Sequence, residues 1–160
     1  MSVREPLGHR PLVERLWRAT AEGRLPHALL LEGPEGIGKF LAARWFAAGF
    51  LCEEGPGPPC GVCGPCKRLT SGGDYGNHSG FFLLDSALEN EEFIRVHRIA
   101  YRPDTARIPD PERCVEMFLD LKLLEGTGRI VLIRECHRMN PSAPTCAASP
   151  ACSRSSPRSS

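Results

Sequence analysis

The sequence carries almost no net charge and has no long apolar run. Its 160 residues include 20 Lys and Arg against 19 Asp and Glu, which gives a formal charge of +1. This balance argues against electrostatic binding of nucleic acid or membrane by the whole surface of the chain, and a local basic patch stays open. No stretch approaches the roughly 18 apolar residues of a membrane span, and the first residues contain no apolar signal-peptide core. We therefore expect a cytoplasmic protein with no membrane partner.

The last twenty residues lack the side chains that build a core. Residues 141–160 contain no Leu, Ile, Val, Phe, Asp or Glu, and they include seven Ser and four Pro. A segment of this composition cannot bury an apolar face, so we expect a disordered tail behind a globular body over residues 1–140. Two interpretations of this tail stay open. It is a natural linker, or a change of reading frame has replaced folded sequence.

Helical and strand-like patterns alternate along residues 1–140. Helices are predicted where apolar positions follow a helical period or a proline marks a first turn, over residues 9–22, 40–51, 91–101 and 111–122. Buried strands are predicted from short apolar runs over residues 28–32, 81–85 and 129–133. Residues 67–80 are expected to form a loop. Strands that alternate with helices predict an α/β fold with a parallel sheet.

A glycine-rich loop stands between the first predicted strand and the next helix. It fits the pattern G-x-x-x-x-G-K, and its residues are Gly33, Pro34, Glu35, Gly36, Ile37, Gly38 and Lys39. In such a loop the glycines let backbone N–H groups face phosphate oxygens, and the lysine reaches the outer phosphates. The next residue is normally Ser or Thr, which holds Mg²⁺, but here it is Phe40. The alternative is a loop that keeps the turn and no longer serves a nucleotide.

A second nucleotide-binding motif also lacks the residue that would hold Mg²⁺. The strand at residues 129–133 is of the kind that usually ends in Asp-Glu, and here it is followed by Arg134 and Glu135. A cation replaces the carboxylate that would hold Mg²⁺, and a base without a placed metal does little. We expect no ATP hydrolysis by this chain alone and assign no catalytic residue. Binding of ATP without turnover stays open.

Four cysteines are clustered in the segment 52–66. Cys52, Cys60, Cys63 and Cys66 have the spacing C-x7-C-x2-C-x2-C. Four thiolates at short spacing suit a closed, tetrahedral Zn²⁺ site that is structural rather than catalytic. A pair of disulfides is disfavoured because we expect a cytosolic protein, in which thiols stay reduced. An iron–sulfur cluster is a further alternative. Cys114 and Cys136, outside the cluster, are expected to be buried thiols.

These features together resemble the bacterial clamp-loader subunits of the AAA+ class, the delta-prime and gamma/tau subunits of DNA polymerase III. The resemblance covers about residues 5–140. It rests on the segment Gly23–Leu30, the glycine-rich loop, the four-cysteine insertion after the following helix, and the segment Ile130–Asn140. It implies an AAA+ P-loop core with an incomplete sheet and a zinc module inserted at 52–66.

The resemblance also implies a subunit type. The ATPase of the gamma/tau type needs the Ser or Thr after the lysine and the Asp before the glutamate, where this chain has Phe40 and Arg134. It is therefore more similar to delta-prime, a stator that lies beside gamma/tau and delta in the ring. Through them it helps to load the sliding clamp onto primed DNA. The arginine-finger motif Ser-Arg-Cys of the family is not found before residue 141. The alternatives are an active gamma/tau-type ATPase and a zinc module that binds nucleic acid.

The family pattern bears on the tail as well. Relatives of this class continue after Met-Asn with a helix rich in Leu, Lys and Glu, whereas this chain becomes rich in Ser and Pro. With permitted codons, residues 151–159 read in another frame as Leu-Leu-Lys-Ile-Leu-Ala-Glu-Glu, which is close to that helix. We expect a frameshifted or prematurely ended gene after about residue 140.

Overall fold

The chain divides into two compact units. In this computed structural model the described residues are 5–71, 78–86, 92–100, 114–124 and 128–139. The first unit comprises Met1–Leu83 and Leu123–Leu132, and the second comprises Leu84–Lys122 and Ile133–Ser160. The tail predicted over residues 141–160 lies outside the described residues.

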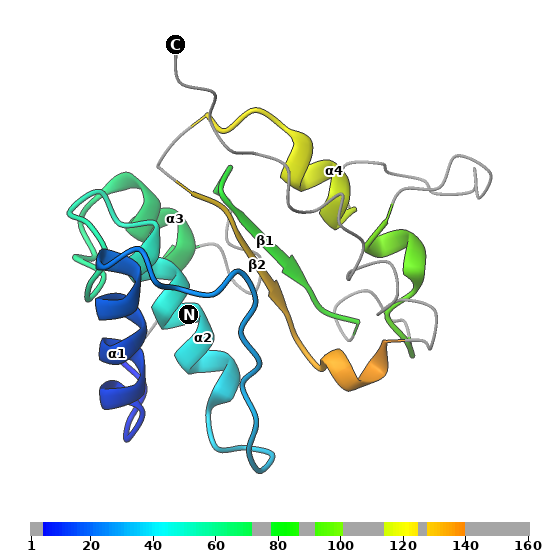
Figure 1. Cartoon of the computed structure of the whole chain (residues 1–160), viewed down its shortest axis with the longest axis horizontal. Helices are drawn as coiled ribbons and strands as arrows, with labels where there is room; N and C mark the ends of the chain where they lie inside the picture. The colour runs from blue at the N-terminus through cyan, green and yellow to red at the C-terminus, as the bar shows by residue number, and fades with distance from the viewer. Residues whose placement is uncertain (1–4, 72–77, 87–91, 101–113, 125–127, 140–160) are drawn as a thin grey trace. The chain divides into compact units, whose positions relative to one another are not determined.

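The described part of the first unit contains three helices, α1 (Arg10–Ala21), α2 (Lys39–Phe50) and α3 (Gly64–Ser71) (Figure 1). The helices predicted over 9–22 and 40–51 are confirmed, but the loop predicted over 67–80 is wrong in its first part. Pro65 stands in the first turn of α3, and the buried Cys66 and Leu69 follow three residues apart. That spacing is a helical signal. No described helix has the length and apolar character needed to cross a membrane.

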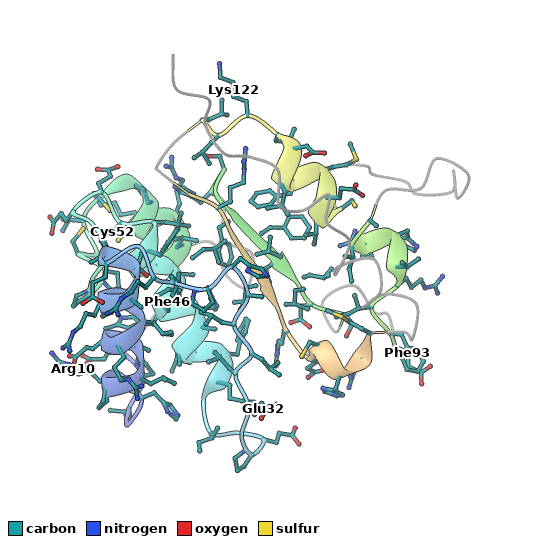
Figure 2. The ribbon with its side chains drawn as sticks, in the orientation of Figure 1. Arg10, Glu32, Phe46, Cys52, Phe93 and Lys122 are labelled. Atoms are coloured by element: carbon teal, nitrogen blue, oxygen red, sulfur yellow. The ribbon has the colours of Figure 1, made fainter. Side chains whose placement is uncertain are left out.

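The core of the first unit lies between α1 and α2. Its buried members are Val13, Trp17, Ala42, Trp45 and Phe46. Phe46 is labelled in Figure 2. The rings of the two tryptophans lie 4.8 Å apart at 54°, and the Trp17 indole N–H donates to the Phe46 carbonyl at 3.4 Å. The indole therefore fills the core without leaving its polar nitrogen unpaired.

The sheet has two strands, β1 (Phe81–Leu84) and β2 (Ile130–Ile133). The amide of Ile130 donates to the Gly80 carbonyl at 2.8 Å, and the amide of Arg134 donates to the Leu84 carbonyl at 2.9 Å. Both residue numbers rise together, so the strands are parallel. The strands predicted over 81–85 and 129–133 are confirmed, and so is their parallel direction.

The strand predicted over residues 28–32 is wrong. This segment has no regular secondary structure, and Leu29 and Leu30 are 45% and 66% exposed. A strand exists only through hydrogen bonds to a neighbour. Within the described part of the chain the two strands pair with each other, and none pairs with this segment. The apolar composition of the run could not show whether a neighbouring strand would pair with it.

Among its described residues the second unit contains α4 (Val115–Asp120) and two short 3₁₀ turns, η1 (Val96–Arg98) and η4 (Cys136–Arg138). The helix predicted over 91–101 is wrong for the described residues 92–100. The Ile94 amide donates to the Arg138 carbonyl at 2.9 Å, and Ile94 forms a parallel bridge with Met139. Pairing with a distant segment thus uses backbone groups that a helix would need. The helix predicted over 111–122 is shorter, and residues 111–113 lie outside the described part.

Candidate functional site

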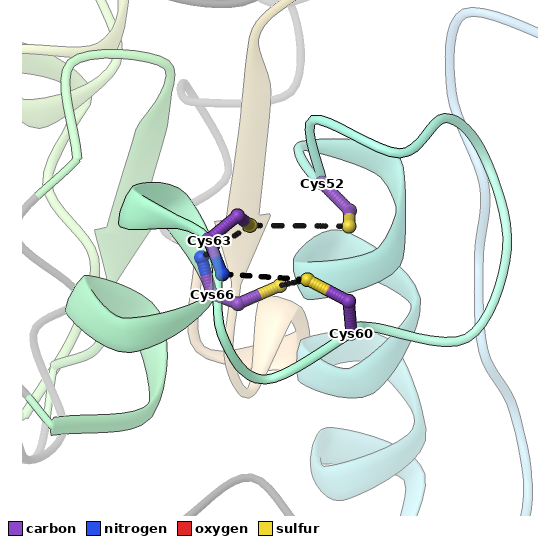
Figure 3. A group of neighbouring side chains, drawn as sticks. All are labelled: Cys52, Cys60, Cys63 and Cys66. Carbon is purple, nitrogen blue, oxygen red and sulfur yellow. Dashed lines mark hydrogen bonds between the residues drawn. The ribbon is translucent and has the colours of Figure 1, made fainter.

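The four cysteines of the predicted metal site lie together in the first unit. Cys52 follows the end of α2, Cys60 and Cys63 lie on the loop that comes next, and Cys66 lies in the first turn of α3 (Figure 3). Their Sγ atoms all lie within 4.8 Å of one another, with 3.9 Å between Cys52 and Cys63 and 4.0 Å between Cys60 and Cys66. The four cysteines that the sequence groups together therefore lie together among the described residues.

The spacing of the sulfurs fits a tetrahedral zinc ion. Zn–S bonds of about 2.3 Å in a tetrahedron put neighbouring sulfurs about 3.8 Å apart. The observed 3.9 and 4.0 Å agree with this edge length. A disulfide needs about 2.05 Å, and all four thiols are free. The disulfide alternative is therefore absent from this structure, and the four sulfurs could serve as a complete ligand set.

Local backbone geometry prepares one thiol of the cluster for ionisation. The Cys63 amide donates to the Cys60 sulfur at 3.4 Å, and with the Val62 amide it lowers the pKa of Cys60 from 9.0 to about 7. Burial acts in the opposite direction on Cys52 and Cys66, and it raises the pKa of each thiol. Backbone N–H donors stabilise a thiolate, and metal binding requires thiolates.

Close packing holds the cysteine loop against α2. A Cβ added at Gly49 would lie 1.9 Å from the Gly57 carbonyl oxygen and 2.7 Å from the Trp17 ring. Gly49 is buried on α2, and Gly57 lies between the first two cysteines of the cluster. The absence of a side chain at Gly49 therefore lets the loop backbone reach the helix.

The glycine-rich loop leads directly into α2. Gly33, Gly36 and Gly38 have φ values of 144°, 79° and 93°, and residues that carry a side chain rarely adopt such values. Lys39 is the first residue of α2, and its ammonium donates to the Gly33 and Pro34 carbonyls at 2.8 and 2.7 Å. The lysine charge is thus held at the loop by the loop's own backbone.

Two side chains next to this loop have contacts that spacing did not predict. Phe40 has no oxygen to offer a metal, and its ring lies under the Arg44 guanidinium at 5.7 Å. His9, the N-cap residue of α1, forms a hydrogen bond of 2.7 Å between Nε2 and the Ile37 carbonyl. No sequence signal connects His9 with the loop, because 28 residues separate it from Ile37.

The second altered motif lies in the second unit and forms ion pairs. The Arg134 guanidinium contacts the Asp85 carboxylate at 3.0 Å, and the Asp85 side chain is completely buried. Glu135 has a left-handed backbone with φ of 55°, and its carboxylate pairs with Arg138 at 2.8 Å. Arg134 thus neutralises a buried acid at the carboxyl ends of β1 and β2. Asp85 was predicted as the end of a strand, and its pairing was missed.

The two cysteines outside the cluster differ from each other. Cys114 is buried, as predicted, and its thiol lies 3.3 Å from the Ile99 carbonyl. Cys136 is exposed, so its predicted burial is wrong. It lies in the 3₁₀ turn after β2 rather than on the strand itself, and the apolar strand before it gave a misleading expectation.

Comparison with known proteins finds subunits of DNA polymerase III that are similar to this chain. Residues 8–145 match the family described as DNA polymerase III, delta subunit. The DNA polymerase III subunit delta' of Bacillus subtilis is 40% identical over 73 residues, which cover 46% of this chain and 21% of that protein. The subunit tau of the same organism is 37% identical over 85 residues, 52% of this chain and 14% of tau. The subunit tau/gamma of Haemophilus influenzae is 37% identical over 105 residues, 63% and 15% of the two chains. This chain spans about a fifth or less of the length of these relatives.

Proposed function

We propose a function for this chain from its membership of the DNA polymerase III delta-subunit family, to which it belongs. It is a non-catalytic, stator-like clamp-loader subunit of the delta-prime type. Its partners are then the gamma/tau and delta subunits. Through them it contributes to the loading of the sliding clamp onto primed DNA. The relatives with similar sequence include both delta' and tau proteins, so the choice between the two types rests on the residues of this chain.

The observation that carries the proposal is the Arg134–Asp85 pair. Phosphoryl transfer in P-loop proteins uses a hydroxyl after the loop lysine and a carboxylate after the second strand to hold Mg²⁺. Here Arg134 supplies a positive charge where that carboxylate would be, and it is already paired with a buried acid. Phe40 supplies a ring in place of the hydroxyl. Two separate supports for the metal are thus replaced by groups that cannot ligate it.

The glycine-rich loop retains the groups that contact phosphate. Its glycines keep their positive φ values and Lys39 lies at its end, so we propose that it holds the phosphates of ATP or ADP without turnover. The loop then serves assembly or rigidity of the subunit rather than chemistry.

The cysteine cluster is proposed as a structural zinc site. The sulfurs leave no position open for a substrate, because four protein ligands complete a tetrahedron. Cys52 follows the end of α2 and Cys66 lies in the first turn of α3, so a bound ion would tie the two helices together. A bound ion would supply cross-linking, and the adjoining helices fix the positions of the Cys52 and Cys66 sulfurs.

Turnover and assembly test the proposal on the same preparation. We expect no Mg²⁺-dependent ATP hydrolysis above that of Lys39→Ala, about one zinc per chain, and co-elution with a gamma/tau partner. Sustained hydrolysis that Lys39→Ala abolishes would instead support the gamma/tau-type ATPase. Salt-dependent binding to DNA without binding to gamma/tau would support the nucleic-acid module.

A further inference from the structure

His9 is the one side chain from outside the loop and its helix whose described hydrogen bond reaches the loop backbone. Its Nε2 lies 2.7 Å from the Ile37 carbonyl oxygen. A carbonyl only accepts, so Nε2 carries the hydrogen and donates it. The edge of the same ring faces Gly38, where an added Cβ would lie 3.9 Å from the imidazole Cδ2. The ring therefore supports the loop over two consecutive residues.

This contact sets the direction of one peptide plane. In a trans peptide the carbonyl and the following N–H point in opposite directions. When His9 holds the Ile37 carbonyl, the N–H of Gly38 must point away from the ring. Gly38 has φ of 93°, and such left-handed residues in a glycine-rich loop turn successive N–H groups toward a common concavity that accepts anions.

Lys39 acts on the other end of the same loop. Its ammonium holds the Gly33 and Pro34 carbonyls, whereas His9 holds the Ile37 carbonyl. Each of the three carbonyls accepts a hydrogen bond from one of these two side chains, so none needs to turn toward the anion. Without His9 the Ile37–Gly38 peptide can rotate and present an oxygen, which repels phosphate, in place of an N–H.

We propose that His9 is a positioning residue for phosphate binding, which orients the Gly38 amide toward the phosphates of a nucleoside diphosphate or triphosphate. The proposal rests on the proposed function of the loop as a phosphate site. His9 does not touch the ligand. It couples the start of α1 to the loop, so the fold of α1 and the affinity for phosphate depend on each other.

Two substitutions separate the donor from the ring. His9→Gln keeps an N–H donor at similar reach, and His9→Phe keeps a ring and removes the donor. His27→Phe, at an exposed histidine that precedes the loop, is the matched control. Affinity is measured by calorimetry for ADP and for inorganic pyrophosphate, without Mg²⁺. The urea midpoint is recorded for each variant.

One hydrogen bond contributes about 0.5–1.5 kcal/mol, which corresponds to about a twofold to tenfold change in affinity. We expect His9→Phe to weaken the binding of both ligands by this factor while the chain keeps a cooperative urea transition, whose midpoint falls modestly because the same hydrogen bond is lost from the folded state. His9→Gln should restore most of the affinity, and His27→Phe should leave it unchanged.

Equal affinity of His9→Phe and the unaltered chain would overturn the role of His9 and leave the phosphate site intact. Equal weakening in His9→Gln and His9→Phe would also overturn it, because the donor would then not matter. If the unaltered chain binds neither ADP nor pyrophosphate, the phosphate site itself is refuted together with the role of His9. The stator proposal is judged separately, by co-elution with gamma/tau.

Discussion

Replacement of Gly49 by alanine tests how the cysteine loop is attached to the helical core. The added methyl carbon would lie 1.9 Å from the Gly57 carbonyl oxygen. Real Cβ atoms do not come within 3.0 Å of such an atom, so the loop must retreat by at least 1.1 Å. The Trp17 ring, at 2.7 and 2.9 Å from the same position, must also move.

Two opposing effects decide the sign of the change. Alanine in a helix interior is favoured over glycine by about 1 kcal/mol. Overpacking of a core costs about 1–3 kcal/mol, and the upper end applies because a backbone carbonyl cannot change rotamer. The net loss in free energy of unfolding is therefore about 2 kcal/mol. With a urea slope of about 2 kcal/mol per molar, the midpoint falls by about 1 M.

Tryptophan fluorescence during urea denaturation measures this change directly. The only two tryptophans of the sequence, Trp17 and Trp45, both belong to the core that the substitution disturbs. Gly57→Ala is the matched control, because it adds the same methyl group on the other side of the contact in open space. We expect it to change the free energy of unfolding by no more than about 0.5 kcal/mol. A midpoint for Gly49→Ala at or above that of the unaltered chain would refute the close packing of loop and helix.

Further predictions concern charge and thiol chemistry. Arg134→Met should lower the free energy of unfolding by about 1–3 kcal/mol, because it removes a charge partner of the buried Asp85. This value is below that of a fully buried pair because Arg134 is 40% exposed. Circular dichroism during urea denaturation measures this loss. The control is Arg138→Met, which removes a more exposed ion pair and should lower the free energy of unfolding by at most about 1 kcal/mol. Equal losses of stability in the two variants would contradict the prediction. In metal-free protein at pH 7.5, iodoacetamide should modify Cys60 before Cys66, as mass spectrometry can show, because the pKa of Cys60 is lowered to about 7 and that of Cys66 is raised. The thiolate of Cys60 stabilises the metal-free fold above pH 9, and this contribution should be lost as the pH falls through 7. A urea midpoint that increases when the pH is lowered from 9 to below 7 would contradict the lowered pKa of Cys60.

Local patterns predicted most of the elements that position the site. The helices that became α1 and α2 and the strands that became β1 and β2 carry strong apolar periods or runs, and these patterns need no knowledge of distant residues. The segment 28–32 shows the limit of this reasoning. An apolar extended run is encoded locally, but strand pairing depends on a partner elsewhere in the chain, and the described residues supply none.

The sequence by itself determined the four-cysteine cluster and the glycine-rich loop, because each is defined by residues that lie close together along the chain. Only the tertiary structure decided which distant residues contact one another. His9 meets Ile37 across 28 residues, Arg134 meets Asp85 across 49, and Gly49 accommodates the Gly57 carbonyl through the absence of a side chain. The physical reason is that such contacts depend on how helices and strands pack. Packing brings together residues whose separation along the chain carries no periodic signal.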